Sequence, residues 1–342
     1  MAEICTQIDT SEAAWAGEDL KDQSTWAYTI TPSDQEEIDR VMSGLRANPL
    51  PLARINRSVF ELPTLGPKLL KFSREIRDGR GFKVVRGLKI ANYTDDEVGC
   101  IFWGVGTYLG SPVAQNPKGD LLGHVLDQGR TYGNIDVRGY ETKAHLPFHS
   151  DGSDIVGLLC LRKSRSGGLS SLVSSVTLHN EILRRHPEFL PILYRGFRYI
   201  KREAALTESP VSAREIPVFG YAQGNISCRF VGNQIRAAAA KLGKPLQDME
   251  LRALDFMDAL AYSPKLHLSF PLDIGDMMFC NNYTILHSRT EFEDWPEPER
   301  RRHLLRLWLT FRHRRPLPPG FPAQNGYGIG HIAEVAFEKA AS

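Results

Sequence analysis

The sequence of 342 residues lacks the features that mark several large classes of protein. Its five cysteines are scattered and form no Cys-x-x-Cys pair, which disfavours both a disulfide framework and a zinc site built on cysteine pairs. No apolar run is long enough to cross a bilayer, and the N-terminus carries no basic start followed by an apolar block. We therefore expect a cytoplasmic protein with reduced thiols and no membrane partner.

The sequence also has little excess charge and no nucleotide-binding motif. Its formal net charge is only +2, and its basic run at 300–302 is short and lies in a charged turn, so no nucleic-acid partner is expected. Neither a Gly-x-Gly-x-x-Gly motif nor a Walker loop is present, which argues against a parallel nucleotide-binding sheet. The expected partner is a small-molecule substrate, and the sequence leaves open whether the chain forms a homo-oligomer.

Apolar residues make up 42% of the sequence, which is enough for a sizeable core, and their spacing predicts several helices. Ser33 and Glu36 have the spacing of a capping box and predict a helix that begins at Ser33. Thr94 and Glu97 predict another helix in the same way. Thr177 is expected to cap a third helix.

Strand-like segments dominate the final third of the chain and occur in four earlier stretches. They are residues 80–88, 154–163, 196–203, 216–231, 265–270, 275–282, 284–289 and 303–311. With helices before and between them, the pattern indicates an α+β protein with a sheet-built core and helices packed outside. We expect residues 1–342 to form a single domain, with a catalytic β core at about 60–315, an irregular N-terminal arm and a Pro/Gly-rich C-terminal tail.

A divided set of metal-ligand residues is the strongest chemical signal in the chain. His149 and Asp151 are two positions apart, so on an extended segment both side chains project to one face. His287 lies far along the chain in a predicted strand, and we expect it to supply the third donor. A His-x-Asp pair alone arises easily by chance among ten histidines, so the context of His287 matters. Two imidazoles and one carboxylate with open positions suit Fe(II) and O2 better than a closed structural zinc site.

The predicted strand that follows His287 carries two arginines on one face. Alternation places Arg302, Arg306 and Trp308 on one face, while the opposite face, with Leu305, Leu307 and Leu309, is the packing face. Cations on an inward face are costly unless they meet anions or water. Pairing with structural carboxylates is one interpretation. The interpretation that we favour is that both arginines bind anions in a cavity, and that one of them binds the carboxylate of an organic co-substrate.

At these positions the sequence resembles the taurine dioxygenase-like (TauD/TfdA-like) family of Fe(II)/2-oxoglutarate-dependent oxygenases. The resemblance covers the chain from about residue 60 to 315 and includes the segments GFKVVRGL, GDLLGHVLDQG, PFHSDGSD, SGGLSSLVSS and NNYTILHSRTEFEDWPEPERRRHLLRLWL. The family fold is a double-stranded β-helix, or jelly roll, with buttressing helices. The resemblance therefore implies a jelly-roll core for the predicted α+β protein.

The resemblance also implies roles for particular residues. His149, Asp151 and His287 would bind Fe(II). Arg302, aided by the hydroxyl group of Ser170, would bind the distal carboxylate of 2-oxoglutarate, the organic co-substrate.

Further positions match regions of the family that contact the substrate. Arg306 matches a position that can hold an acidic group on the substrate, and His145, Gln115 and Asn116 match regions that line the substrate pocket. The polar residues at these places differ from those of taurine dioxygenase, so taurine is not the expected substrate.

The resulting expectation is a 2-oxoglutarate-dependent non-haem iron dioxygenase of secondary metabolism. It would use O2 to oxidise an unactivated C–H bond of a small anionic substrate, an amino acid or a related acid, with release of succinate and CO2. Hydroxylation, desaturation and oxidative cyclisation remain open, because all three can follow the same hydrogen abstraction. Two other classes also remain open: a metal-dependent jelly-roll hydrolase or isomerase, and a non-catalytic binding protein.

Overall fold

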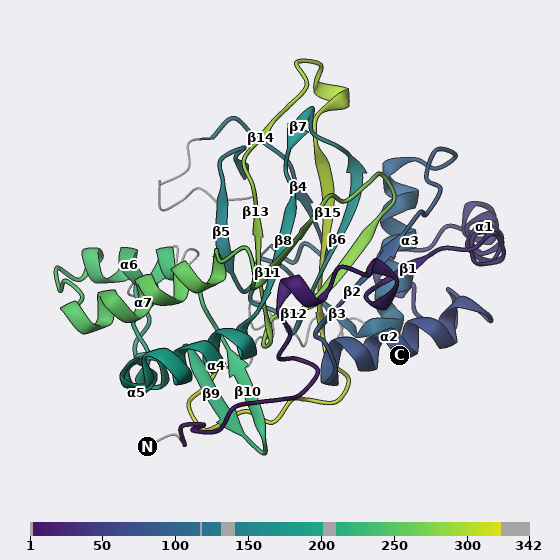
Figure 1. The fold of residues 1–342 in the computed structure, drawn as a ribbon. Helices are drawn as coiled ribbons and strands as arrows, with labels where there is room; N and C mark the ends of the chain where they lie inside the picture. The colour runs from purple at the N-terminus through teal and green to yellow at the C-terminus, as the bar shows by residue number, and fades with distance from the viewer. Residues whose placement is uncertain (1–2, 117, 131–140, 201–209, 323–342) are drawn as a thin grey trace.

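The structure, a computed structural model, describes residues 3–116, 118–130, 141–200 and 210–322. Two facing β-sheets form its centre, and helices flank them on both sides (Figure 1). Strands that follow one another along the chain alternate between the sheets: β5 and β6 lie in different sheets, as do β11 and β12, and β13 and β15. This alternation is the double-stranded β-helix, and it confirms the predicted α+β jelly-roll core.

The larger sheet has the strand order β1-β2-β12-β6-β15-β3, and β4 also pairs with β15. Its members are β1 (Ala27–Thr29), β2 (Phe82–Arg86), β12 (Met277–Asn281), β6 (Ile155–Arg162), β15 (His303–Thr310), β3 (Ser111–Val113) and β4 (Leu122–Val125). The first pair is parallel and the others are antiparallel. The central strand β6 was predicted from its apolar run, and it is buried along almost its whole length.

The smaller sheet has the order β11-β8-β13-β5, and all its pairs are antiparallel. Its members are β11 (His267–Phe270), β8 (Ser170–Ser174), β13 (Ile285–Arg289) and β5 (Leu146–His149). Two short antiparallel pairs lie outside both sheets: β9 (Phe219–Ala222) with β10 (Asn225–Cys228), and β7 (Ser166–Gly167) with β14 (Phe292–Glu293).

Side chains from the two inner faces interlock to form the central core. Leu172 and Ile285 of the smaller sheet meet Val156, Met278 and other apolar residues of the larger sheet. The N-terminal arm also contributes to this core, because the tryptophan side chains of residues 15 and 26 are buried in it. Most inward-facing positions at the centre of the two sheets are therefore apolar.

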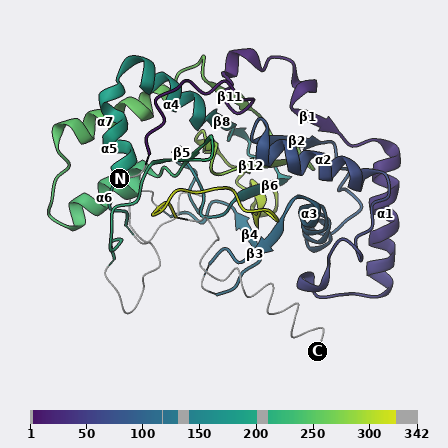
Figure 2. The same ribbon diagram turned by 90° about the horizontal axis from the view of Figure 1, so that it is seen from below.

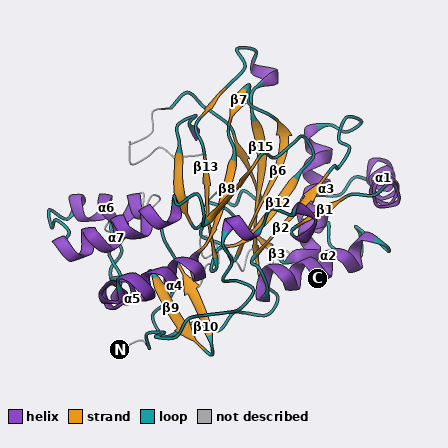
Figure 3. Cartoon of the chain, in the orientation of Figure 1, coloured by secondary structure: helices purple, strands orange, loops and turns teal. Residues whose placement is uncertain are grey.

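Two groups of helices cover the outer faces of the sheets, as Figures 2 and 3 show. The larger sheet is covered by α1 (Pro32–Ala47), α2 (Leu65–Asp78) and α3 (Asp95–Leu109), and the smaller by α4 (Ser175–Arg185), α5 (Leu190–Arg195), α6 (Gly232–Lys241) and α7 (Asp248–Ala261). The outer face of β15 packs Leu305, Leu307 and Leu309 beneath the first group. A Cβ atom at Gly106 of α3 would lie 2.3 Å from Leu307 Cδ2, so this glycine permits the close approach of helix and strand.

Helix starts were predicted with mixed accuracy. The capping box of Thr94 and Glu97 is present at the start of α3, as expected. The predicted start of α1 at Ser33 was wrong, because Thr31 is the N-cap and Pro32 occupies the first turn, where its missing N–H costs nothing. Thr177 does not cap α4; its own backbone N–H donates to the capping side chain of Ser174.

Helices α2 and α6 were not predicted from the sequence. In α2, Leu65, Leu69, Phe72 and Ile76 are buried at helical spacing, so the periodic signal was present but was missed. Within the described residues, no helix is both long and apolar enough to span a bilayer.

Candidate metal centre

The centre begins with two histidines that the sheet places directly opposite each other. His149 is the last residue of β5, and in the antiparallel pairing of β5 with β13 its partner is His287. Ile285 and His287 alternate with the outward-facing Leu286, so the imidazole of His287 points into the space between the sheets. The two imidazole centroids are 4.3 Å apart. The pairing of β5 with β13 thus joins residues that lie far apart in the sequence.

Asp151 lies in the turn after β5, and hydrogen bonds fix the backbone of that turn. The N–H of Ser150 donates to the carbonyl oxygen of Phe230 at 2.9 Å. The N–H of Asp151 donates to Asn282 Oδ1 at 3.0 Å, and the Asn282 amide in turn donates to the carbonyl oxygen of Ser153 at 2.8 Å. Asn282 belongs to the turn between β12 and β13, so the elements that carry Asp151 and His287 are tied together.

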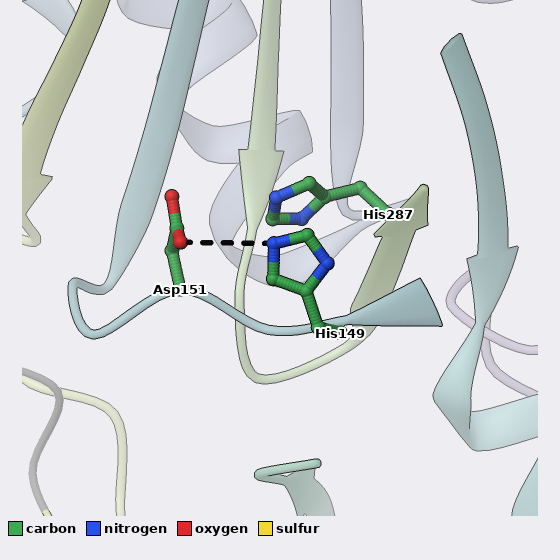
Figure 4. A group of neighbouring side chains, drawn as sticks. All are labelled: His149, Asp151 and His287. Atoms are coloured by element: carbon green, nitrogen blue, oxygen red, sulfur yellow. Dashed lines mark ion pairs between the residues drawn. The ribbon is translucent and has the colours of Figure 1, made fainter. Parts of the chain in front are cut away.

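The three predicted donors converge, as Figure 4 shows. One ligand atom from each of His149, Asp151 and His287 lies within 4.8 Å of those of the other two. His149 Nε2 is 3.9 Å from Asp151 Oδ1. This grouping of two imidazoles and one carboxylate is the composition of a facial triad for Fe(II).

The protonation states of these side chains, like their positions, are suited to binding a metal ion. His149 Nδ1 is 2.8 Å from the carbonyl oxygen of Pro147, an arrangement that leaves Nε2 with its lone pair toward Asp151. Burial, with His149 nearby, lowers the pKa of His287 to about 3, so its imidazole is neutral at physiological pH. Its Nδ1 is buried and has no hydrogen-bond partner among the described residues.

The carboxylate of Asp151 is ionised in this setting. Burial opposes the charge, but Arg306, both histidines and the indole N–H of Trp308 outweigh it and lower the pKa of Asp151 to about 2. Neutral imidazoles and an ionised carboxylate are the ligand states that a divalent cation requires. The residues present therefore fit a bound ferrous ion.

Arg306 lies beside this centre on the inner face of β15. Its Nη1 is 3.7 Å from Asp151 Oδ2, and its guanidinium lies 4.9 Å from the centroid of the Trp308 ring. Its Nε donates to Gln115 Oε1 at 2.7 Å. The predicted alternation of β15 is thus confirmed. Arg306 and Trp308 face inward, whereas Leu305, Leu307 and Leu309 pack against the helices.

Arg302 lies four residues before Arg306, immediately ahead of β15, and is also buried. Its guanidinium packs 5.0 Å from the centroid of Phe292, and its Nη1 is buried without a hydrogen-bond partner among the described residues. Burial lowers its pKa to about 10, which still leaves it charged at neutral pH. A small pocket adjoins it, lined in part by Lys163, Ser164 and Gly168.

Glycine makes room for the Arg302 side chain. Gly168 has φ +70°, and a Cβ atom there would lie 3.1 Å from Arg302 Nε. Ser170 begins β8 two residues later and is buried opposite Arg289 of β13. Arg289 packs on the same Phe292 ring as Arg302, at 4.6 Å. Ser170 therefore lies at the end of the site where Arg302 is found.

The three remaining predicted residues have partners of their own. The Gln115 amide nitrogen donates to the carbonyl oxygens of Arg306 at 2.7 Å and of Leu121 at 3.0 Å. Its amide oxygen accepts from Arg306 Nε, so both the nitrogen and the oxygen have hydrogen-bond partners. Asn116 closes its own surface turn through Asp120. His145 Nε2 is 2.6 Å from the Tyr262 hydroxyl group on the side of the smaller sheet covered by helices.

Sequence reasoning missed two residues that organise the centre. Asn282 holds the Asp151 turn, and the motif Asn281-Asn282 before the β13 strand was the available signal. Arg289 follows His287 by two residues and donates to the carbonyl oxygen of Ala144, just before β5. Its position on the inward face of β13 was predictable from alternation, but its partner was not.

Comparison with known proteins gives matches over most of the chain. The family described as Taurine catabolism dioxygenase TauD, TfdA family matches residues 46–308. FR-33289 synthase of Streptomyces rubellomurinus is 31% identical over 322 residues, which are 93% of this chain and 95% of that protein. The taurine hydroxylase-like protein SAT17 of Stachybotrys chartarum is 30% identical over 326 residues, which are 90% of this chain and 82% of that protein.

Solved structures share the fold at lower sequence identity. Asparagine oxygenase in complex with Fe(II), 2S,3S-3-hydroxyasparagine and succinate gives a TM-score of 0.66 at 18% identity, covering 83% of this chain and 93% of that one. The non-heme iron oxygenase OrfP in complex with Fe, succinate and (3S)-hydroxy-L-Arg gives a TM-score of 0.63 at 18% identity, covering 83% and 94%.

Fold, donor set and relatives together define a non-haem iron dioxygenase that uses 2-oxoglutarate as co-substrate. The matched region spans most of the jelly roll and includes the triad as well as both inward-facing arginines. The chain belongs to the TauD/TfdA family.

Proposed function

We propose that this enzyme oxidises an unactivated C–H bond of a small anionic substrate at a ferrous ion held by His149, Asp151 and His287. The observation that carries the proposal is the convergence of these three donors within 4.8 Å, beside two buried guanidinium groups. Bound Fe(II), with 2-oxoglutarate and O2, supplies the oxidising chemistry and releases succinate and CO2.

The first role of the fold is to hold the three donor side chains in position before the metal ion binds. Strand pairing fixes His149 against His287, and Asn282 fixes the backbone of Asp151. As a facial triad, these three residues would leave further positions of the ion open for co-substrate and O2. Apolar residues of the central core surround the site and limit access of water.

Arg302 is the residue that we assign to the distal carboxylate of 2-oxoglutarate. Support comes from its buried, unpartnered Nη1 and from the space that Gly168 leaves beside it. A guanidinium binds a carboxylate through paired, charge-assisted hydrogen bonds, which are strong in a buried site. Ser170 lies at the same end and is assigned the accompanying hydroxyl donor.

Arg306 is assigned to an acidic group on the substrate. Its guanidinium lies near Asp151, so an anion bound there would place the rest of the substrate beside the metal position. Gln115 holds Arg306 through its Nε and its backbone carbonyl oxygen, and we assign Gln115 to positioning this arginine. His145 and Asn116 are proposed to shape the outer wall of the substrate pocket.

An amino acid, or an acid related to one, is the proposed substrate. Two solved structures with this fold are described as complexes with hydroxylated asparagine and hydroxylated arginine, and FR-33289 synthase is named for its product. These descriptions, together with the cationic Arg306, support a small acid of secondary metabolism. Hydroxylation, desaturation and ring closure are distinguished by the mass of the product.

The test is succinate formation by the purified enzyme with Fe(II), 2-oxoglutarate and a set of amino acids and related acids. We expect stimulation by at least one acid, with a product heavier by one oxygen or lighter by two hydrogens. His149→Ala, Asp151→Ala and His287→Ala should each lose turnover and anaerobic Fe(II) binding. Full activity in any of the three, or metal-dependent hydrolysis without succinate, would refute the proposal.

A further inference from the structure

The two carboxylate oxygens of Asp151 have different surroundings. Oδ1 faces His149, with 3.9 Å between it and Nε2 of that histidine. Oδ2 accepts a hydrogen bond of 3.0 Å from the indole N–H of Trp308, and Arg306 Nη1 lies 3.7 Å from it. The two oxygens therefore have different neighbours, an imidazole for Oδ1 and an indole N–H for Oδ2.

This asymmetry matters because a carboxylate can bind a metal through one oxygen or through both. In a six-coordinate site, two imidazoles and a one-oxygen carboxylate leave three open positions. Chelation by the keto acid end of 2-oxoglutarate takes two of them, and O2 needs the third. A two-oxygen carboxylate would remove one of these positions.

The groups that hold Oδ2 are themselves fixed in place. Trp308 is buried on the inner face of β15 and pairs in register with Val156 of the central strand β6. The ring of Trp308 is covered on one side by Arg306, whose Nε is bound by Gln115. The backbone of Gly152, next to Asp151, lies close to the six-membered ring of this indole. A Cβ atom added at Gly152 would be 3.5 Å from Trp308 Cη2. The strand pairing and these contacts hold the indole N–H of Trp308 toward Oδ2.

We propose that Trp308, supported by Arg306, is a positioning residue that restricts Asp151 to one-oxygen coordination and so preserves an open position for the co-substrate and O2. The inference rests on the proposed function, because it takes Asp151 to be a metal ligand. It assigns to a tryptophan at the strand end a role that neither binds substrate nor ligates metal. Partners of ligating side chains commonly change metal-site properties by 10–100-fold when they are removed.

The test uses the full chain loaded anaerobically with Mn(II), so that no turnover is needed. Water-proton relaxation counts the exchangeable waters on the bound ion, and calorimetry measures the affinity for 2-oxoglutarate. The wild-type protein should show three such waters, which is the number that one-oxygen coordination leaves. Trp308→Phe keeps an aromatic side chain but loses the indole N–H. This variant should show two waters and about 10-fold weaker 2-oxoglutarate binding, with Mn(II) affinity kept or increased.

Two controls isolate the hydrogen bond. Leu309→Val loosens the same strand from its opposite face and should leave both measurements unchanged. Trp308→His retains a ring N–H and should recover most of the 2-oxoglutarate affinity. Two waters in the wild-type protein, an unchanged Trp308→Phe variant, loss of Mn(II) from that variant, or an equal effect in Leu309→Val would each overturn the inference.

Asp151→Ala separates this inference from the proposed function. If that variant binds Mn(II) as the wild type does, the ligand assignment fails and the role of Trp308 fails with it. If Asp151→Ala loses Mn(II) while Trp308→Phe behaves as the wild type in both measurements, the proposed function stands and only the role of Trp308 is refuted.

Discussion

Replacing Arg302 with methionine should weaken co-substrate binding while it stabilises the protein without ligand. Burial lowers the pKa of Arg302 from 12.5 to about 10, and its Nη1 has no hydrogen-bond partner among the described residues. At about 1.4 kcal/mol per pKa unit, keeping this charge buried costs about 3 kcal/mol. The cost is present at neutral pH, because the group remains charged below its folded-state pKa.

Methionine removes the charge and retains an apolar side chain of similar length. The variant loses the contact of the guanidinium with Phe292, a cation–π interaction of about 0.5–1 kcal/mol. After this loss and some imperfect packing, we expect a net increase of about 1–2 kcal/mol in the free energy of unfolding of the protein without 2-oxoglutarate. Urea or thermal unfolding with coincident probes measures it.

The same substitution should abolish most of the affinity for 2-oxoglutarate. A pair of charge-assisted hydrogen bonds to the distal carboxylate contributes about 3 kcal/mol, which corresponds to a Kd about 100-fold higher. Anaerobic calorimetry on the Mn(II)-loaded protein measures the Kd. Arg300→Met is the matched control, since Arg300 is exposed against Trp295 and should change neither quantity.

Two results would refute this reasoning. Unchanged 2-oxoglutarate affinity in Arg302→Met would remove Arg302 from the co-substrate site. A loss of several kcal/mol of stability in the protein without ligand would show that Arg302 is a structural cation with a carboxylate partner.

Three further predictions follow from the site and the core. Arg306→Ala should raise the KM for the substrate about 100-fold while Fe(II) binding is retained, and unchanged substrate kinetics would exclude the acid-binding role. Gln115→Leu should raise the same KM about 10-fold because it releases Arg306, whereas Asn116→Ala, on the neighbouring surface turn, should not. Burial lowers the pKa of His179 to about 4, below its unfolded value of 6.5, so its share of stability is complete above pH 6.5 and is lost as the pH falls toward 4. That share is about 3 kcal/mol, and His179→Gln should flatten the decline of unfolding free energy over this pH range; an unchanged slope would contradict the assignment.

Local patterns in the sequence predicted the elements that depend on neighbouring residues. The capping box at Thr94 predicted the start of α3, and strict alternation predicted which residues of β15 face inward. The errors at Ser33 and Thr177 have a related cause: several capping residues stood within one turn, and propensity alone did not choose among them. Helix α2 had a clear apolar stripe, so its omission was an oversight rather than a limit of the sequence.

The metal-ligand residues could also be predicted from the sequence, but the contacts that position them could not. His149, Asp151 and His287 were identified by residue type and spacing, and their convergence confirms the grouping. The partners of Gln115 and Trp308 were not foreseen, because each hydrogen bond joins segments more than one hundred residues apart. Such contacts depend on which strands pair and in which register.

The amino-acid sequence by itself therefore determined the donor types, the inward face of β15 and the family of the chain. Tertiary structure alone decided that His149 pairs with His287, that Trp308 reaches one particular oxygen of Asp151, and that the guanidinium of Arg302 is buried without a salt bridge to any described carboxylate. The physical reason is that side-chain periodicity is local, whereas strand register and burial arise only when the two sheets close on a common core.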